Sequence, residues 1–194
     1  MSRSSYYAPQ GGLPPQTQLL TDRAMFTESF AVIPKGTLTD IVTSNLPFWN
    51  DTRVWVIARP MSGFSETFSH YIAEVAPGGG SEQPELNPEA QSVLFVVEGS
   101  IAVTIEGARH ELGDGGYAYL PAGSTWTLKN DSDAPAKFHW VRKKYEAVEG
   151  IKAPEAFVTS DAETPINYMP DTDGKWGTTR FVEPDDLRHD MHVN

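Results

Sequence analysis

The sequence predicts an all-β protein, an antiparallel sandwich or barrel with hardly any helical pattern. Short runs of β-branched and aromatic residues recur at close spacing, and Gly and Pro clusters separate them. The clearest pair is Val93–Val97 and Ile101–Ile105, which the turn dipeptide Glu98-Gly99 connects. In the second run Ile101, Val103 and Ile105 lie at alternate positions, which is the period of a strand. Strands joined by hairpins in this way are typical of antiparallel sheets.

The remaining strands are expected on both sides of this hairpin. Before it, the sequence predicts strands at Ser29–Ile33, Arg53–Ala58 and Phe68–Val75. After it, the sequence predicts strands at Ala108–Leu112, Tyr117–Leu120, Ser124–Leu128 and Lys137–Arg142. Residues 1–20 are rich in Pro, Gly, Gln and Tyr without periodicity, so we expect an irregular arm there.

The character of the chain changes after Tyr145. Residues 146–194 hold 11 acidic and 4 basic residues, with frequent Pro and Gly. This composition indicates a connector with few strands, expected at Phe157–Thr159 and Thr178–Val182, and the pattern of a strand resumes at Met191. The chain is therefore divided into an arm (1–20), a β-domain (21–145) and a connector (146–194).

The composition and the net charge of the chain exclude several classes of function and partner. The chain has 194 residues, 39% of them apolar and 21% charged, which is enough to bury the core of one domain. Its formal net charge of -11 disfavours nucleic acid and anionic membrane surfaces as partners. Since the sequence holds no cysteine, disulfides, thiolate metal sites and a cysteine nucleophile are excluded. Without a signal sequence or an apolar run long enough to span a bilayer, the chain is expected to be cytoplasmic.

A motif in the second half of the predicted domain identifies the fold more closely. The residues Gly115, Pro121, Gly123, Trp126 and Asn130 have the spacing Gly-x5-Pro-x-Gly-x2-Trp-x3-Asn. This spacing resembles the second motif of the cupins, which has a metal-binding histidine in place of the tryptophan. The Gly and Pro positions suit a tight connection between strands. The resemblance implies a cupin barrel, also called a double-stranded β-helix or jelly roll, within residues 21–145.

The usual cupin metal ligands are missing from this barrel. The first cupin motif would end at Gly99, which places Ser92 where the family has a glutamate ligand. Two histidine ligands would fall near Glu85–Asn87, and no histidine is there. Because zinc, manganese or iron needs about three or four converging ligands, we expect no metal in this barrel. Trp126 is expected to fill the interior with its indole or, alternatively, to form an aromatic platform for a ligand.

The chain resembles one family of cupins over roughly residues 19–194. The segments that carry the resemblance are Thr21-Asp-Arg23-Ala-Met25, Phe30-Ala-Val-Ile-Pro34, Gly36-Thr-Leu38, Glu98-Gly99, Gly115–Ser124 and Arg142–Tyr145. They are similar to the N-terminal half of the (S)-ureidoglycine aminohydrolases, bicupins of purine catabolism that are also labelled glyoxylate-induced proteins. The resemblance implies a protein with two cupins, of which this chain supplies the N-terminal half.

The resemblance also implies where the chemistry lies. In the family, manganese and the substrate belong to the second cupin, with Glu, His and Gln ligands, and the first cupin is degenerate. The segment Asp190–Asn194 is similar to the point at which the second cupin begins. Residues 146–194 are therefore interpreted as a connector and the opening strands of a second, truncated cupin. No catalytic residue, metal ligand or cofactor is expected within this segment, and the catalytic ligands are expected beyond Asn194.

The implied activity is the hydrolysis of (S)-ureidoglycine to (S)-ureidoglycolate and ammonia, an aminohydrolase reaction at a ureido C–N bond in allantoin degradation. A small ureido substrate and a homo-oligomer are the implied partners, and the 194-residue segment alone is expected to be inactive. The alternative is a metal-free cupin that binds a small ligand or acts as a sensory module without catalysis. Its pocket would be lined by Gln83, Gln91, Trp126 and His139.

Other candidate side chains have structural explanations. His70 and His139 lie within predicted strands, where either could face the barrel interior as a core histidine. His189 and His192 are three residues apart, which places them on opposite faces of a strand and disfavours a shared metal. The acidic cluster 183–186 is expected to be a solvated turn rather than a cation site. The basic run 142–144 is expected to be a strand exit exposed to water rather than an anion site.

Overall fold

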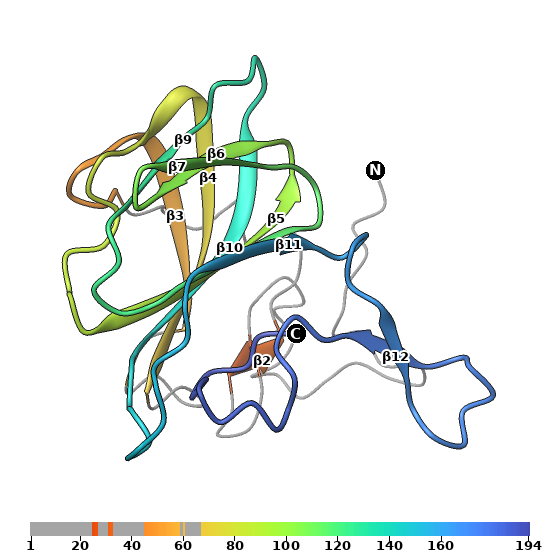
Figure 1. The fold of residues 1–194 in the computed structure, drawn as a ribbon. Coiled ribbons are helices and arrows are strands. Elements are labelled where there is room, and N and C mark those ends of the chain that lie inside the picture. Colours follow the sequence, from red (N-terminus) through yellow and green to blue (C-terminus); the bar gives the residue numbers. More distant parts are fainter. Residues whose placement is uncertain (1–24, 27–30, 33–44, 59, 61–66) are drawn as a thin grey trace.

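The computed structural model describes residues 25–26, 31–32, 45–58, 60 and 67–194, and these residues form strands and no helix (Figure 1). The strands are β1 (Met25–Phe26), β2 (Ala31–Val32), β3 (Trp49–Ala58), β4 (Phe68–Ser81), β5 (Ala90–Glu98), β6 (Ile101–Ile105), β7 (Ala108–Leu112), β8 (Gly116–Leu120), β9 (Trp126–Lys129), β10 (Ala136–Lys144), β11 (Phe157–Ser160), β12 (Ile166–Tyr168) and β13 (Gly177–Thr179). In this part of the chain, nothing forms a helix of the length and apolarity that a membrane span requires.

Nine strands form one antiparallel sheet that curls into a barrel (Figure 1). Their order is β11-β8-β5-β10-β4-β9-β6-β7, and β3 also pairs with β4. The strand β10 inserts between β4 and β5, so that Phe138 lies opposite Ala73 on one side and Val96 on the other. The sheet therefore encloses one interior, as the sequence predicts for a cupin barrel.

Alternate residues of each strand fill the barrel interior. Leu94 and Val96 of β5 pack there with Phe138 and Trp140 of β10 and with Trp126 of β9. The residues between them point to the outer face of the sheet, because successive side chains of a strand alternate in direction. This outer face is covered as well, and β5 is buried on both faces over most of its length.

The outer face carries a second hydrophobic cluster, which the C-terminal part of the chain covers. Its buried members are Val93, Tyr117, Tyr119 and Met191, and Phe95, Val141, Phe157, Phe181 and Val193 pack against them. The strand β11 adds to the edge of the sheet through β8, whereas the β12–β13 hairpin extends away from the barrel (Figure 1). Residues 181–194, here called the strap, thus cross the outer face of the barrel sheet.

Asn130, the last residue of the cupin-like motif, joins neighbouring segments of the barrel. Its Nδ2 donates hydrogen bonds to the carbonyl of Val75 (2.9 Å) and to that of Ala134 (2.8 Å). Its Oδ1 accepts from the backbone N–H of Ser132 (2.9 Å). The side chain has no exposed area, so these bonds satisfy polar groups that water cannot reach.

Glycines have two separate roles in this barrel. Two of them adopt a left-handed backbone in the motif, and one allows two strands to approach closely. Gly115 and Gly123 of the motif have φ values of 76° and 78°, in the left-handed region that favours glycine. Gly80 of β4 has a φ of 141° and pairs with Lys129 of β9. A Cβ at Gly80 would lie 2.1 Å from the carbonyl oxygen of Leu128, so β4 and β9 can meet here only because the residue lacks a side chain.

The predicted strands from Arg53 to Arg142 are confirmed, with ends that differ by a few residues, and the strand predicted at Phe157–Thr159 is confirmed as β11. Of Ser29–Ile33, the structure describes only Ala31–Val32, which form β2, and the predicted arm 1–20 lies outside the described residues. The strand β12 was not predicted, and the one predicted at Thr178–Val182 is reduced to β13. The division of the chain at residue 145 stays a prediction.

The strand predicted from Met191 onward is not formed. Met191 and Val193 instead pack through their side chains against the outer cluster. Asn194 contributes its side chain, whose Oδ1 accepts a hydrogen bond from the N–H of Phe181 (2.9 Å). The strap is therefore held by side-chain contacts and not by a ladder of backbone hydrogen bonds.

Candidate functional site

The positions expected for metal ligands are occupied by packed side chains. Ser92 of β5 accepts a hydrogen bond at Oγ from the Nε1 of Trp140 (3.0 Å). The Trp126 ring lies edge-on to the Trp140 ring, with 6.1 Å between centroids, and Trp126 is only 5% exposed. Among the described residues, no three His, Asp or Glu side chains gather where they could hold a metal ion. The residues of this interior therefore do not fit a cupin metal site.

The segment Glu85–Asn87, where the cupin resemblance predicts two histidine ligands, holds one carboxylate, that of Glu85. This carboxylate is paired with Arg142. Glu85 lies in the loop between β4 and β5, and its Oε1 accepts hydrogen bonds from the guanidinium of Arg142 and from the N–H of Asn87 (2.8 Å). The Glu85 side chain is 9% exposed. An ion pair with arginine thus occupies the segment in which the cupin resemblance predicts ligands.

A cavity of about 280 Å³, here called the Trp140 pocket, lies beside this ion pair. Its aromatic walls are Trp49 and Tyr71, each with its ring centroid 5.5 Å from that of Trp140. The Arg142 guanidinium lies 5.6 Å from the Trp140 ring centroid, in the range of a cation–π contact. The remaining lining residues are Leu46, Pro47, Pro84, Glu85, Leu86 and Asn87. The pocket combines flat apolar walls with one charged pair, as small-molecule sites commonly do.

The strap is tied to the outer face by Asp190. Its Oδ1 accepts a hydrogen bond from the Nε2 of Gln91, whose Oε1 in turn accepts from the hydroxyl of Tyr119 (2.9 Å). Its Oδ2 accepts from the ammonium of Lys143 and from the N–H of Glu146 (2.8 Å). Burial opposes ionisation of Asp190, but the hydrogen bonds from Lys143, Gln91 and the backbone outweigh it and hold the pKa of Asp190 below its usual value. This network joins β5, β8, β10 and the strap.

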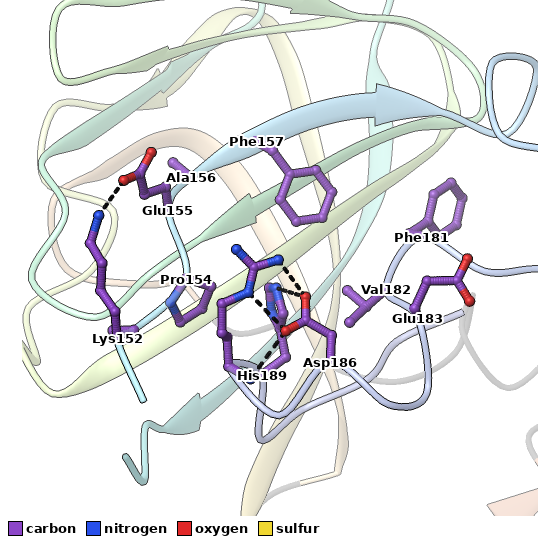
Figure 2. Close-up of a pocket in the computed structure, with 12 residues that line it drawn as sticks. Lys152, Pro154, Glu155, Ala156, Phe157, Phe181, Val182, Glu183, Asp186 and His189 are labelled. Carbon is purple, nitrogen blue, oxygen red and sulfur yellow. Dashed lines mark hydrogen bonds and ion pairs between the residues drawn. The ribbon is translucent and has the colours of Figure 1, made fainter. Parts of the chain in front are cut away.

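A second cavity, of about 420 Å³, lies between the strap and the segment that enters β11 (Figure 2). Phe157 and Phe181 line it together with Lys152, Ala153, Pro154, Glu155, Ala156, Val182, Glu183, Asp186, Arg188 and His189. The Nε and Nη2 atoms of Arg188 donate to the two oxygens of Asp186 (2.8 and 2.7 Å), and this contact with arginine lowers the pKa of Asp186 to about 2. Lys152 pairs with Glu155 (2.6 Å). The lysine and the arginine that line the cavity are therefore already paired with carboxylates, and the carboxylate of Glu183 is exposed.

His189 closes the inner side of this second cavity. Its ring packs edge-on against Tyr119, with 4.6 Å between centroids, and its Nε2 is 3.7 Å from Asp186. Burial is the main cause of the lowered pKa of His189, which favours the neutral ring. The His192 ring centroid is 6.5 Å from that of His189, and no strand separates the two rings onto opposite faces. The prediction of opposite strand faces for this pair is wrong, because the strap is not a strand.

The structure separates the four residues that the sequence groups into one pocket. Trp126 lies in the barrel interior, whereas Gln91 and His139 lie on the outer face, because they alternate with the inward-facing Ser92 and Trp140. Gln83 is exposed in the loop after β4. The four side chains therefore do not face one common space. Whether any of them contacts a ligand stays a prediction.

Sequence reasoning also missed the pairing of the basic run at the end of β10. Arg142 pairs with Glu85, Lys143 with Asp190, and Lys144 with Glu89 (3.0 Å). The side chain of Lys143 is only 14% exposed, so the expectation of a strand exit exposed to water is wrong for this residue, whereas Lys144 is exposed as predicted. The acids come from distant loops, so only knowledge of long-range contacts could have found them. In the acidic cluster 183–186, Glu183 and Asp185 are exposed as predicted, and Asp186 binds Arg188.

His70 and His139 form a cross-strand pair on the outer face, not in the interior. The Nε2 of His70 and the Nδ1 of His139 are 2.7 Å apart, a hydrogen bond that requires at least one neutral ring. Burial, and then the proximity of His139, lowers the pKa of His70 to about 4, and burial lowers the pKa of His139.

This pair predicts a loss of stability in mild acid. Between about pH 6.5 and about pH 4, the unfolded chain binds a proton at His70 and the folded chain does not, so the free energy of unfolding falls as the pH falls through this window. His70→Gln keeps a hydrogen-bonding group that does not titrate, and it should flatten the dependence. Urea unfolding at several pH values measures it, with His110→Gln of β7 as the matched control. An equally steep dependence in His70→Gln and the wild type would contradict this prediction.

Comparisons with known proteins agree with the fold and narrow the family. A model described as "Cupin domain" matches residues 71–142. The crystal structure of a glyoxylate-induced protein from Pseudomonas aeruginosa is 56% identical, with a TM-score of 0.82, over 97% of this chain and 68% of that chain. Protein Ylba from E. coli, 24% identical over 92% of this chain and 68% of that chain, has a TM-score of 0.75 and shows the same fold.

A curated relative adds an activity to the comparison. The (S)-ureidoglycine aminohydrolase of Escherichia coli is 28% identical over 134 residues, which is 68% of this chain and 49% of that protein. The chain thus spans about half the length of this relative. The high identity to the Pseudomonas aeruginosa protein, over two thirds of that protein's length, decides the family. This chain belongs to the cupin family of the glyoxylate-induced proteins.

Proposed function

We propose that this chain is the first cupin of an aminohydrolase that converts (S)-ureidoglycine to (S)-ureidoglycolate and ammonia. The observation that carries the proposal is the match of 68% of the chain to a curated (S)-ureidoglycine aminohydrolase. The 56% identity to a glyoxylate-induced protein supports the same family. Because the chain spans about half of the curated relative, the activity is proposed for a longer protein and not for these residues alone.

The side chains of the barrel support a division of labour between two cupins. Ser92 and Trp126 are engaged with Trp140, and Glu85 is engaged with Arg142, so the usual cupin ligand positions present no set of metal ligands. The manganese that the family resemblance implies would therefore be held by residues of a second cupin. No step of the reaction is assigned to the described residues, and we propose that they support the fold of the active half.

The net charge of the protein supports a proposal about its location in the cell and its partners. A net charge of -11 disfavours nucleic acid and anionic lipid, and it suits a cytoplasmic enzyme that acts on a small ureido compound. We also propose that the protein forms a homo-oligomer. The relatives do not favour the alternative of a sensory module without catalysis, since the curated one is named as an aminohydrolase.

Ammonia release from (S)-ureidoglycine tests the proposal. The assay compares the 194-residue chain with a hybrid in which the part of the Pseudomonas aeruginosa protein that this chain does not cover follows Asn194. We expect no release above background from the 194-residue chain. We expect turnover from the hybrid with manganese, and its loss with a chelator. Full turnover by the 194-residue chain that a chelator does not inhibit would contradict the assignment of the chemistry to the second cupin.

A further inference from the structure

The β12–β13 hairpin exposes large apolar side chains on a part of the chain that extends away from the barrel (Figure 1). Among the described strands, β12 and β13 pair only with each other. Ile166 and Tyr168 of β12 are 55% and 60% exposed. Met169 and Trp176, which face each other at the start of the turn, are 41% and 71% exposed. Because a hairpin of two short strands is marginally stable by itself, and grouped apolar side chains on a surface usually mark a contact, this hairpin is a candidate docking arm.

An arginine without a carboxylate partner lies at the base of the hairpin. Every other described Lys and Arg side chain has a carboxylate oxygen within 3.7 Å. Arg180 directly follows β13, is partly buried, and makes no side-chain hydrogen bond or ion pair with the residues that the structure describes. In a chain with 26 acidic and 15 basic residues, a partly buried and unpaired arginine is unusual. Its guanidinium is therefore available to a carboxylate of another molecule.

The tip of the hairpin carries carboxylates that lack strong partners. Asp171 is exposed and has no side-chain partner among the described residues, and Asp173 reaches only Lys175, at 3.7 Å. About seven residues of extended chain, or roughly 20 Å, separate Asp173 from Arg180. The acidic tip and the arginine at the base therefore cannot meet within one hairpin.

The order of these groups along the hairpin is self-complementary. Tyr168 lies opposite Gly177, so Tyr168 and the neighbouring Trp176 are about midway between the acidic tip and Arg180. When two copies of the hairpin lie side by side in opposite directions, their aromatic side chains meet at the centre, and each tip lies beside the base of the other. The carboxylates of each tip then face the partner's Arg180 at both ends of the contact. Charge and apolar surface are thus matched by one arrangement with twofold symmetry.

We propose that the β12–β13 hairpin docks onto the same hairpin of a second copy of this chain, antiparallel about a twofold axis. Tyr168 and Trp176 pack at the axis, and the tip carboxylates bind the partner's Arg180. This interface belongs to the proposed homo-oligomer and rests on it, but it does not depend on the proposed hydrolysis. Since the hairpin lies outside the barrel core, it should not affect unfolding of the barrel in dilute solution, where the copies dissociate.

Sedimentation equilibrium of the 194-residue protein measures this association. We expect a dissociation constant on the order of micromolar, and Trp176→Ala should raise it by about 100-fold or more, because the ring is lost from both copies. Leu86→Ala removes a side chain of similar exposure (57%) from a loop of the barrel, and as the matched control it should leave the constant unchanged. A monomeric wild type would contradict both this interface and the homo-oligomer. An association that Trp176→Ala leaves intact would contradict the hairpin interface alone.

Two charge reversals test the contact between tip and base. Arg180→Asp sets acid against acid at both ends of the contact, and Asp171→Lys combined with Asp173→Lys sets base against base. Each variant alone should associate about tenfold or more weakly than the wild type. In an equimolar mixture, one end of the contact keeps the wild-type charges and the other has them exchanged, so both ends are attractive. Mixing should therefore restore association of about wild-type strength.

This restoration separates the charges from any effect on folding. Lysine at the tip brings strain, because Asp171 and Asp173 have φ values of 60° and 51°, but the strain is the same alone and in the mixture. Lys129→Asp, on β9 of the barrel, is the control with the same change of charge, and it should neither weaken the association nor restore it in a mixture. If the two reversed variants, folded by circular dichroism, stay as weakly associated when mixed as alone, the contact between tip and base is overturned.

Discussion

Replacing Trp126 by alanine is expected to lower the free energy of unfolding by about 3–5 kcal/mol, the range for large aromatic truncations in a core. The Trp126 side chain is 5% exposed and packs edge-on against Trp140 in the barrel interior. Denaturant unfolding measures the effect. Trp176→Ala is the control, since Trp176 is 71% exposed on the β13 side of the hairpin and its loss should change stability by about 0.5 kcal/mol or less. Equal midpoints for the two variants would place the Trp126 indole outside the core.

Trp126→His restores the histidine of the cupin motif and is still not expected to create a metal site. A single ligand is insufficient, because Ser92 is bonded to Trp140 and Glu85 to Arg142. Elemental analysis of the purified variant after dialysis against manganese or zinc should find no stoichiometric ion. One ion per chain in this variant, and none in the wild type, would show that the interior keeps more of a cupin site than its contacts indicate.

Gly80→Ala should lower the free energy of unfolding by about 3 kcal/mol or more, because strain and overpacking add. The new Cβ would approach the carbonyl oxygen of Leu128 to 2.1 Å, and backbone cannot move aside as a flexible side chain can. It would also force β4 away from β9 where the two strands pair. Thermal and urea unfolding would both report the loss.

Gly78→Ala is the control for the conformational strain of alanine at a positive φ, without overpacking. Gly78 has a φ of 77°, and a Cβ added to it would meet no atom within 4 Å, so alanine there carries only the conformational cost of about 1–2 kcal/mol. The difference between the two variants reports the close approach of β4 and β9 together with the larger conformational cost of alanine at a φ of 141°. Equal losses for both would mean that the backbone at Gly80 relaxes without cost.

The strands of this barrel can be predicted well from the sequence because their signals are local. Alternation in Ile101–Ile105, the turn at Glu98-Gly99 and the fixed spacing of the motif from Gly115 to Asn130 each depend on neighbouring residues. The burial of Trp126 could be predicted for the same reason, since the motif places that residue in the barrel. The lack of metal ligands at Ser92 and Trp126 could also be read from the motif.

The direction of side chains on β5 and β10 could not be predicted, because both faces of these strands are covered. In Val93–Val97 every residue is apolar, so there is no alternation from which to assign Gln91 to the inner or outer face. The outer face becomes buried only when the strap lies on it, and the tie between Gln91 and Asp190 spans 99 residues. The pairing of Glu85 with Arg142 spans 57 residues and was missed for the same reason.

The late place of β10 in the chain has a consequence for how the protein is made. Its contacts reach back 48 residues to Ser92 of β5 and 69 residues to His70 of β4, so the barrel closes through long loops, which makes folding slow. Until β10 is synthesised, β4 and β5 both have an open edge that can pair with another chain. At about 5–20 residues per second, the ribosome takes a few seconds to proceed from β5 to β10. During this interval the nascent chain depends most on protection from aggregation, and the two open edges are covered when β10 inserts between β4 and β5.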